Sequence, residues 1–196
     1  MCNRVLGVQF LRDRLRLGPV KAREAHDVRL RLVRQPSRLF VRPAERATAD
    51  KLRMLRERAA MAFGRTVACA TCGAGRALPH GAYDGGFCCG ATTAEIFSDE
   101  ELGALRLSGT TPWHLVPAPG GPAGCAFRGP KGCVLLPAHR PNQCVRHLCY
   151  DLVVELGRSG RLAMVEDLTE EIFETFLVFT RLRQERIDDE LLGLAP

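Results

Sequence analysis

Eight cysteines fall between residues 69 and 149 of this 196-residue chain. They form a C-x-x-C pair, an adjacent pair, two single cysteines and a closing pair: Cys69 and Cys72, Cys88 and Cys89, Cys125 and Cys133, and Cys144 and Cys149. A C-x-x-C turn brings two thiolates close to one soft cation, and thiolates select zinc, copper(I) or iron–sulfur clusters. Because core cysteines seldom come in such numbers, the sequence predicts a metal-binding region.

The compartment expected for the chain agrees with that prediction. Its start, MCNRVLGVQFLRDRLRLG, lacks the uninterrupted apolar stretch and the small-residue cleavage site of a secretory signal. We therefore expect a cytoplasmic protein, in which clustered thiols mark metal or redox chemistry more often than disulfides. The longest strongly apolar run, FLVF at 176–179, is far shorter than the roughly 20 residues of a membrane span, so we expect no membrane association.

The composition predicts a mainly α fold with a long irregular region rich in Cys, Gly and Pro. Gly and Pro together number 31, and they gather in the connector at 108–132. We divide the chain into three parts. These are a basic N-terminal segment at 1–46, a cysteine-rich metal-binding domain at 47–160, and a C-terminal helical segment at 161–196 that packs on the domain.

Apolar residues spaced by three and four predict the helices. We expect helices from Ala47 towards the C-x-x-C pair, after Ser98, from Asn142 to Gly157, and from Asp167 onwards. Ser98 with Glu101, and Asp167 with Glu170, have the spacing of a capping box. On the first helix Arg53 and Arg56 lie off the apolar face, and the third helix is the expected packing partner of the fourth.

The N-terminal part of the chain is strongly basic. Residues 1–66 carry a net charge of +11, whereas the remaining 130 residues carry −5. Basic and apolar residues alternate in stretches such as VRLRLVRQPSRLFVRP, which suits short strands or an adaptable arm, and Pro36 and Pro43 exclude one long helix. This charge fits binding to nucleic acid. It fits equally an arm that contacts the acidic half of the chain or a protein partner.

The spacing of the cysteines leaves the number of sites open. In extended backbone the adjacent Cys88 and Cys89 point to opposite faces, although Gly85, Gly86 and Gly90 permit unusual backbone angles around them. On a continuous helix Cys144 and Cys149 lie about 140° apart. Eight thiolates make two four-sulfur sites, or one such site with spare cysteines. Three histidines near cysteines are substitute ligands: His80, His139 and His147.

The order of these motifs is similar to one known family. The C-x-x-C pair, the CC pair, GCAF at 124–127, KGCVL at 131–135 and HRPNQCVRHLC at 139–149 resemble the YkgJ-like proteins, which are described as zinc- or iron-chelating. The resemblance covers about 66–158 and implies that all eight cysteines are ligands, with Arg140 and Pro141 leading into the last pair. Fifteen residues separate Cys72 from Cys88, more than is usual in that family.

No enzyme motif accompanies the cysteines. The sequence contains no Gly-rich phosphate loop, no nucleophile elbow and no H-E-x-x-H. A thiol oxidoreductase that uses Cys69 and Cys72 is an alternative, but no βαβ pattern surrounds the pair. The leading hypothesis is therefore a protein that binds zinc or an iron–sulfur cluster, and a metal-stabilised nucleic-acid-binding protein is the second.

Overall fold

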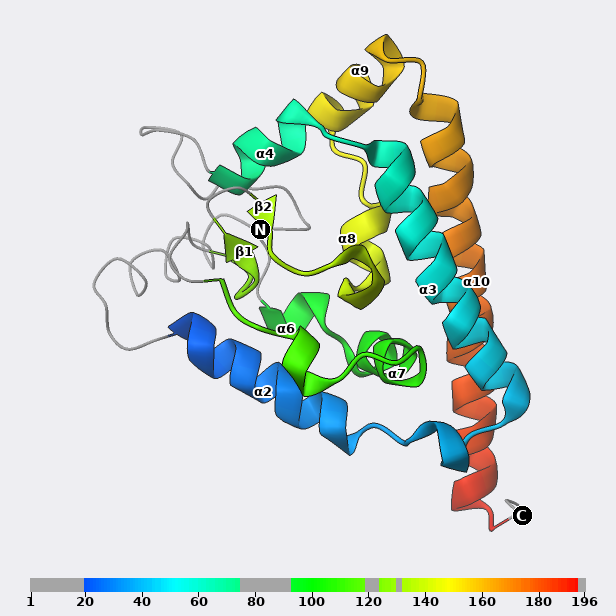
Figure 1. Cartoon of the computed structure of the whole chain (residues 1–196). Coiled ribbons are helices and arrows are strands. Elements are labelled where there is room, and N and C mark those ends of the chain that lie inside the picture. The colour runs from blue at the N-terminus through cyan, green and yellow to red at the C-terminus, as the bar shows by residue number, and fades with distance from the viewer. Residues whose placement is uncertain (1–19, 75–92, 119–123, 130–131, 194–196) are drawn as a thin grey trace.

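The structure of the protein is a computed structural model that describes residues 20–74, 93–118, 124–129 and 132–193 (Figure 1). It is mainly helical, as predicted. The α-helices are α2 (Val20–Arg34), α3 (Pro43–Phe63), α4 (Val67–Ala74), α6 (Thr93–Ile96), α7 (Asp99–Leu107), α8 (Asn142–Arg146), α9 (Tyr150–Arg158) and α10 (Leu162–Leu191). The short 3₁₀ helices are η1 (Arg38–Phe40), η2 (Pro112–His114) and η3 (Pro137–His139). Strands β1 (Arg128–Gly129) and β2 (Gly132–Cys133) pair antiparallel, with Arg128 opposite Cys133.

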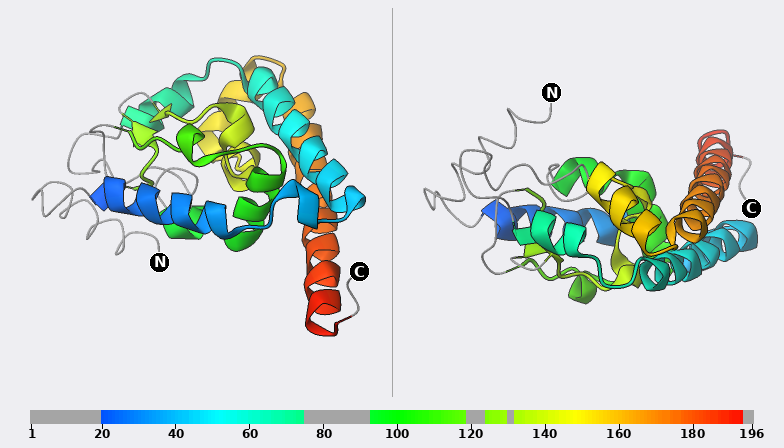
Figure 2. Two further views of the ribbon diagram at one scale, coloured as in Figure 1. Left: turned by 60° about the horizontal axis from the view of Figure 1, so that its bottom comes forward. Right: turned by 90° about the horizontal axis from the view of Figure 1, so that it is seen from above.

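The two longest helices, α3 and α10, lie side by side and antiparallel along one edge of the molecule (Figure 1). Leu52 and Leu55 of α3 share a buried cluster with Ile172 and Phe179 of α10, as the apolar spacing on both helices predicts. The expected contact of the C-terminal helix with the segment after Asn142 is present, since α10 packs against α8 and α9, but its main packing partner is α3. Figure 2 shows that the C-terminal end of α10 extends beyond the other helices.

Helix α10 begins earlier than predicted. It starts at Leu162, and Asp167 lies inside it rather than at a cap. The start at Asp167 was wrong because Val165 is buried with Leu152 and Leu156 of α9, so the apolar contacts continue towards the N-terminus. Gly160, with a φ of 67°, makes the turn between α9 and α10, in a conformation that favours glycine.

The basic N-terminal segment is helical where the structure describes it. For residues 20–34 the expectation of short strands was wrong, because Ala25, Val28 and Leu32 lie buried on one face of α2, and this spacing is that of a helix. Residues 1–19 of the segment lie outside the described residues. The prolines act as predicted. Helix α2 ends before Pro36, and Pro43 is the first residue of α3, where its missing N–H costs nothing.

Several basic side chains among residues 20–66 pair with acidic residues of the protein itself. The ion pairs are Arg31 with Asp99 at 2.8 Å, Arg38 with Asp50 at 2.6 Å, Lys51 with Glu171 at 2.9 Å, and Arg42 with Asp189. Three of these acidic partners belong to the later, acidic part of the sequence. The structure therefore supports the interpretation that the arginine-rich segment contacts the protein's own acidic half.

The region from Asn142 to Arg158 is two helices rather than one. Residues 147–149 are not helical, and Cys149 has extended backbone and precedes α9 as its N-terminal cap residue. The 140° separation expected for Cys144 and Cys149 on one helix therefore does not apply. The apolar spacing runs through the break without interruption, because Val145, Leu152 and Leu156 are all buried, and so the sequence pattern does not reveal the break.

A buried polar network joins α3, α7 and α8. Arg56, which we expected off the apolar face, is fully buried and donates to Asn142 Oδ1 at 3.1 Å, Ser108 Oγ at 3.0 Å and the Ala138 carbonyl at 3.1 Å. Burial lowers the pKa of Arg56 to about 10, and the negative charge of Glu101 acts in the opposite direction. The side chain therefore keeps its charge at neutral pH.

Glu101 stabilises a different helix from the one expected. Ser98 Oγ accepts the Glu101 N–H at 3.3 Å, which confirms the Ser98 cap. The Glu101 carboxylate instead accepts from the N–H groups of Asn142 and Gln143, at 2.9 and 3.2 Å, at the start of α8. Burial raises the pKa of Glu101, and these N–H donors with Arg56 act against that rise. This carboxylate thus fixes the segment that precedes Cys144.

Candidate metal centre

Helix α4 carries the C-x-x-C pair and is fixed in place at its N-terminus. Gly64, with a φ of 60°, ends α3, and the chain turns into α4 at Val67. The carboxylate of Glu155 on α9 accepts the N–H of Val67 at 2.9 Å and that of Ala68 at 2.8 Å. A carboxylate is favourable there because the first N–H groups of a helix have no partner within the helix. Glu155 therefore attaches the start of α4 to α9.

Helix α4 contacts two other elements that carry or adjoin a cysteine. Helix α4 contacts β2 and α9 (Figure 1). Cys69 is exposed on α4, Cys133 lies half-buried in β2, and Cys149 lies half-buried at the start of α9. Cys72 follows one helical turn after Cys69 on α4, although its side chain lies outside the described residues. The fold thus brings together segments that are distant in the sequence.

Three of the described cysteines lie in or against one apolar cluster. Cys125 is buried in the cluster that contains Phe97 and Phe127, and Cys133 and Cys144 pack against that same cluster. Within the connector at 108–132, the Cys125 carbonyl accepts the Arg128 N–H at 2.9 Å. Arg29 of α2 donates to the Leu115 carbonyl of the same connector at 2.7 Å. The described parts of the connector are therefore attached to the helical core.

The structure does not place every predicted ligand. Cys88, Cys89 and His80 lie outside the described residues. Within the ranges that the structure describes, no group of three or more His, Cys, Asp or Glu side chains is arranged to hold a metal ion. The elements that carry the cysteines are adjacent, but a complete ligand set does not appear among the described side chains.

Two of the three candidate histidines are described, and His139 stacks on another histidine. The rings of His114 and His139 lie 3.9 Å apart and nearly parallel. Burial, and then the positive charges of His114, Arg53 and Arg56, lower the pKa of His139 to about 4. Burial and the charge of Arg146 also lower the pKa of His147. Both rings are therefore neutral at pH 7, the form in which imidazole binds metal.

We expect His139 to make folding stability depend on pH between about 6.5 and 4. The unfolded chain binds a proton at this ring below its ordinary pKa of 6.5, whereas the folded chain binds it only near 4, so stability falls as pH falls through this window. A full shift is worth 1.36 kcal/mol per pKa unit, and for this half-exposed ring we expect about 1 kcal/mol after solvent screening. Urea unfolding at pH 7 and pH 5, a range that covers about half of this titration, should show His139→Gln losing about 0.5 kcal/mol of the pH dependence. His26→Gln, at an exposed position on α2, should keep all of it.

We expect Glu155 to control the local stability of α4. Accepting the N–H groups of Ala68 and Val67 lowers the pKa of Glu155, so its contribution is complete at neutral pH and is lost as pH falls through that lowered pKa. In Glu155→Ala, hydrogen exchange at the amides of Val67 and Ala68 should become faster while exchange in α3 stays unchanged. Glu174→Ala, at an exposed position on α10, is the matched control. Equal protection of both amides in Glu155→Ala and the parent would show that α4 does not depend on this carboxylate.

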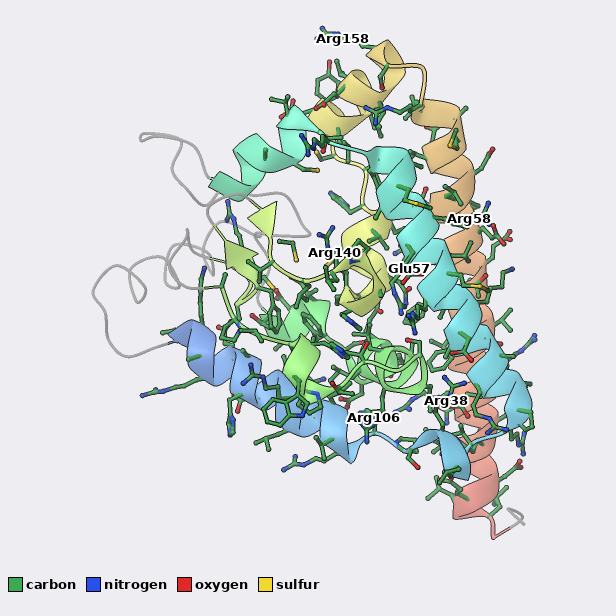
Figure 3. All side chains as sticks on the ribbon, viewed as in Figure 1. Arg38, Glu57, Arg58, Arg106, Arg140 and Arg158 are labelled. Carbon is green, nitrogen blue, oxygen red and sulfur yellow. The ribbon has the colours of Figure 1, made fainter. Side chains whose placement is uncertain are left out.

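Arg146 and Arg140, which flank Cys144, lie in different surroundings. The Arg146 guanidinium lies 4.6 Å from the centre of the Phe173 ring on α10, a contact that joins α8 to α10 through a cation–π interaction. Arg140 donates to the Leu135 carbonyl at 2.8 Å and is labelled beside α8 in Figure 3. Both arginines therefore help to position the segment that carries Cys144.

Sequence reasoning missed Glu155 and the buried role of Glu101. Glu155 lies 87 positions from Ala68 in the sequence, and no local motif connects them. Comparison of the chain with protein families, curated proteins and solved structures finds no match. The resemblance to the YkgJ-like proteins therefore stays a prediction. None of the helices within the described residues is long and apolar enough to cross a membrane.

Proposed function

We propose that this protein binds zinc or an iron–sulfur cluster through cysteines of its 69–149 region. One observation carries the proposal: α4, which holds the C-x-x-C pair, contacts both β2 and α9, which carry Cys133 and Cys149. Thiolates from separate segments that meet in space are the usual way in which a protein surrounds a soft metal ion. In this proposal the eight cysteines of the region supply the ligands, and Glu155 and Glu101 position the segments that carry them.

The geometry gives less support to a thiol oxidoreductase. In such enzymes the N–H groups at the start of a helix stabilise the reactive thiolate. Here the N–H groups of Val67 and Ala68 are bonded to the Glu155 carboxylate, which brings negative charge to the turn that contains Cys69. Nucleic-acid binding is also less supported, since Arg31, Arg38 and Arg42 each form an ion pair with an acidic residue of the same chain at the surface.

A cobalt(II) titration of the reduced, metal-free full chain tests the proposal. Cobalt(II) replaces zinc in thiolate sites and gives intense sulfur-to-metal absorption. We expect this absorption to reach saturation at a whole number of cobalt ions per chain and to disappear when zinc is added. Weak absorption that does not saturate, with all the thiols still open to a thiol reagent, would contradict the proposal.

A further inference from the structure

A groove between α3 and α10 opens to solvent on the outer side of this helix pair. It encloses about 510 Å³, and Ala62 and Leu168 contribute to its lining together with Met61 and Met164. The two methionines are 75% and 57% exposed. Flexible, polarisable methionine side chains are frequent on surfaces that pack against another protein. This groove therefore has the character of a contact surface.

The two helices contribute opposite charges to this groove. Arg58 lies on α3 three residues before Met61, and Asp167 lies on α10 three residues after Met164. Within the described parts of the chain neither of these two charges forms a hydrogen bond or an ion pair, unlike Lys51 and Glu171 nearby, which pair at 2.9 Å. Figure 3 labels Arg58 beside α3 and α10. One rim of the groove thus offers an unpaired cation and the other an unpaired anion.

Further along the same faces of α3 and α10, the exposed residues are of the same kinds. Met54, four residues before Arg58 on α3, is 57% exposed, and Glu171 follows Asp167 by four residues on α10. Residues three and four apart lie on one side of a helix. The α3 side of the surface is therefore basic and apolar, and the α10 side is acidic and apolar.

We propose that this surface is the interface of a two-fold symmetric dimer of the chain. A two-fold interface uses the same patch on both copies, so the patch must contain both members of each complementary pair. A two-fold axis through the groove places α3 of one copy over α10 of the other. Arg58 of each copy then meets Asp167 of the second copy, the exposed methionines pack together between the two ion pairs, and the four helices form a bundle-like contact.

Charge reversal tests this dimer in the full-length protein by sedimentation equilibrium. We expect the parent to dimerise, and Arg58→Glu and Asp167→Arg each to weaken dimerisation by at least about tenfold, because each change places like charges together at two symmetric points. The double variant should dimerise as the parent does. Arg158→Glu, which reverses an exposed arginine on α9, is the control and should leave the dimer unchanged.

A mixture of the two single variants distinguishes a contact between Arg58 and Asp167 of two copies from an effect of either substitution within one chain. In a mixed pair, the carboxylate introduced by Arg58→Glu in one copy meets the guanidinium introduced by Asp167→Arg in the other. The second contact keeps its original charges, so the mixture should form heterodimers although neither variant dimerises well alone. A monomeric parent at every concentration, or a mixture that stays monomeric, would overturn the proposal. The outcome is independent of the metal proposal, because none of the described residues that line the groove is a cysteine.

Discussion

Replacing Arg56 by methionine is expected to lower the free energy of unfolding by about 3 to 5 kcal/mol, the cost of removing one partner from a buried charged network. Methionine fills a similar volume but donates no hydrogen bond. Asn142 Oδ1, Ser108 Oγ and the Ala138 carbonyl then lose their donor, and Glu101 loses the positive charge of Arg56 that favours its ionised form. Urea unfolding at pH 7, followed by circular dichroism, measures the change.

Arg53→Met is the matched control for this experiment. Arg53 lies one turn earlier on α3 and is about half exposed, with Glu57 as its ion-pair partner at 3.5 Å. Exposed pairs of this kind contribute about 1 kcal/mol or less, so the control should lose no more than that. If Arg56→Met and Arg53→Met unfold at the same urea concentration, the buried network does not stabilise the fold as we describe.

Replacing Cys69 by serine is expected to weaken zinc binding by about a hundredfold. Structural zinc sites with four ligands have apparent binding free energies of about 10 to 16 kcal/mol, so one ligand contributes roughly 3 kcal/mol, which corresponds to about two factors of ten in affinity. Competition with a chromophoric chelator under anaerobic conditions measures the affinity. Cys133→Ser and Cys149→Ser should show losses of similar size. Cys133 lies on β2, which contacts α4, and Cys149 is the N-terminal cap residue of α9, which also contacts α4.

Cys2→Ser is the control for the cysteine series. Cys2 is the one cysteine that lies outside the 69–149 region, so its loss should leave the affinity unchanged. Cys88→Ser and Cys89→Ser, tested separately, show whether both adjacent thiols are ligands, since equal losses would mean that the surrounding glycines allow the pair to act together. If Cys69→Ser binds zinc as tightly as Cys2→Ser does, Cys69 is not a ligand.

Local sequence patterns predicted much of the fold. The helical class, the buried face of α3, the Ser98 cap and the breaks at Pro36 and Pro43 all follow from spacing or from the chemistry of one or two neighbouring residues. The same reasoning failed for α2, since alternating arginine and leucine fits a strand and a helix about equally well over a short stretch. Only the position of α2 against α6 and α7 decides between them.

The polar contacts that position the cysteines could not be predicted from the sequence. Arg56 reaches Asn142, and Glu155 reaches Ala68, across 86 and 87 positions of the chain. Such contacts depend on how the helices pack, and a charged residue on a helix is ordinarily exposed. The cysteine set was visible in the sequence because its spacing is local. The proximity of α4, β2 and α9 became visible only with the fold.

The central proposal is that the cysteines of the 69–149 region bind a metal, and the most direct test is the metal content of the full chain purified without oxygen. Elemental analysis, sulfide analysis and the absorption spectrum should be measured on one sample, together with the number of reactive thiols. We expect either stoichiometric zinc in a colourless protein or iron with sulfide in a coloured one, and thiols that react fully only after the metal is removed. A protein that contains neither metal, with all nine thiols freely reactive, would contradict the proposal.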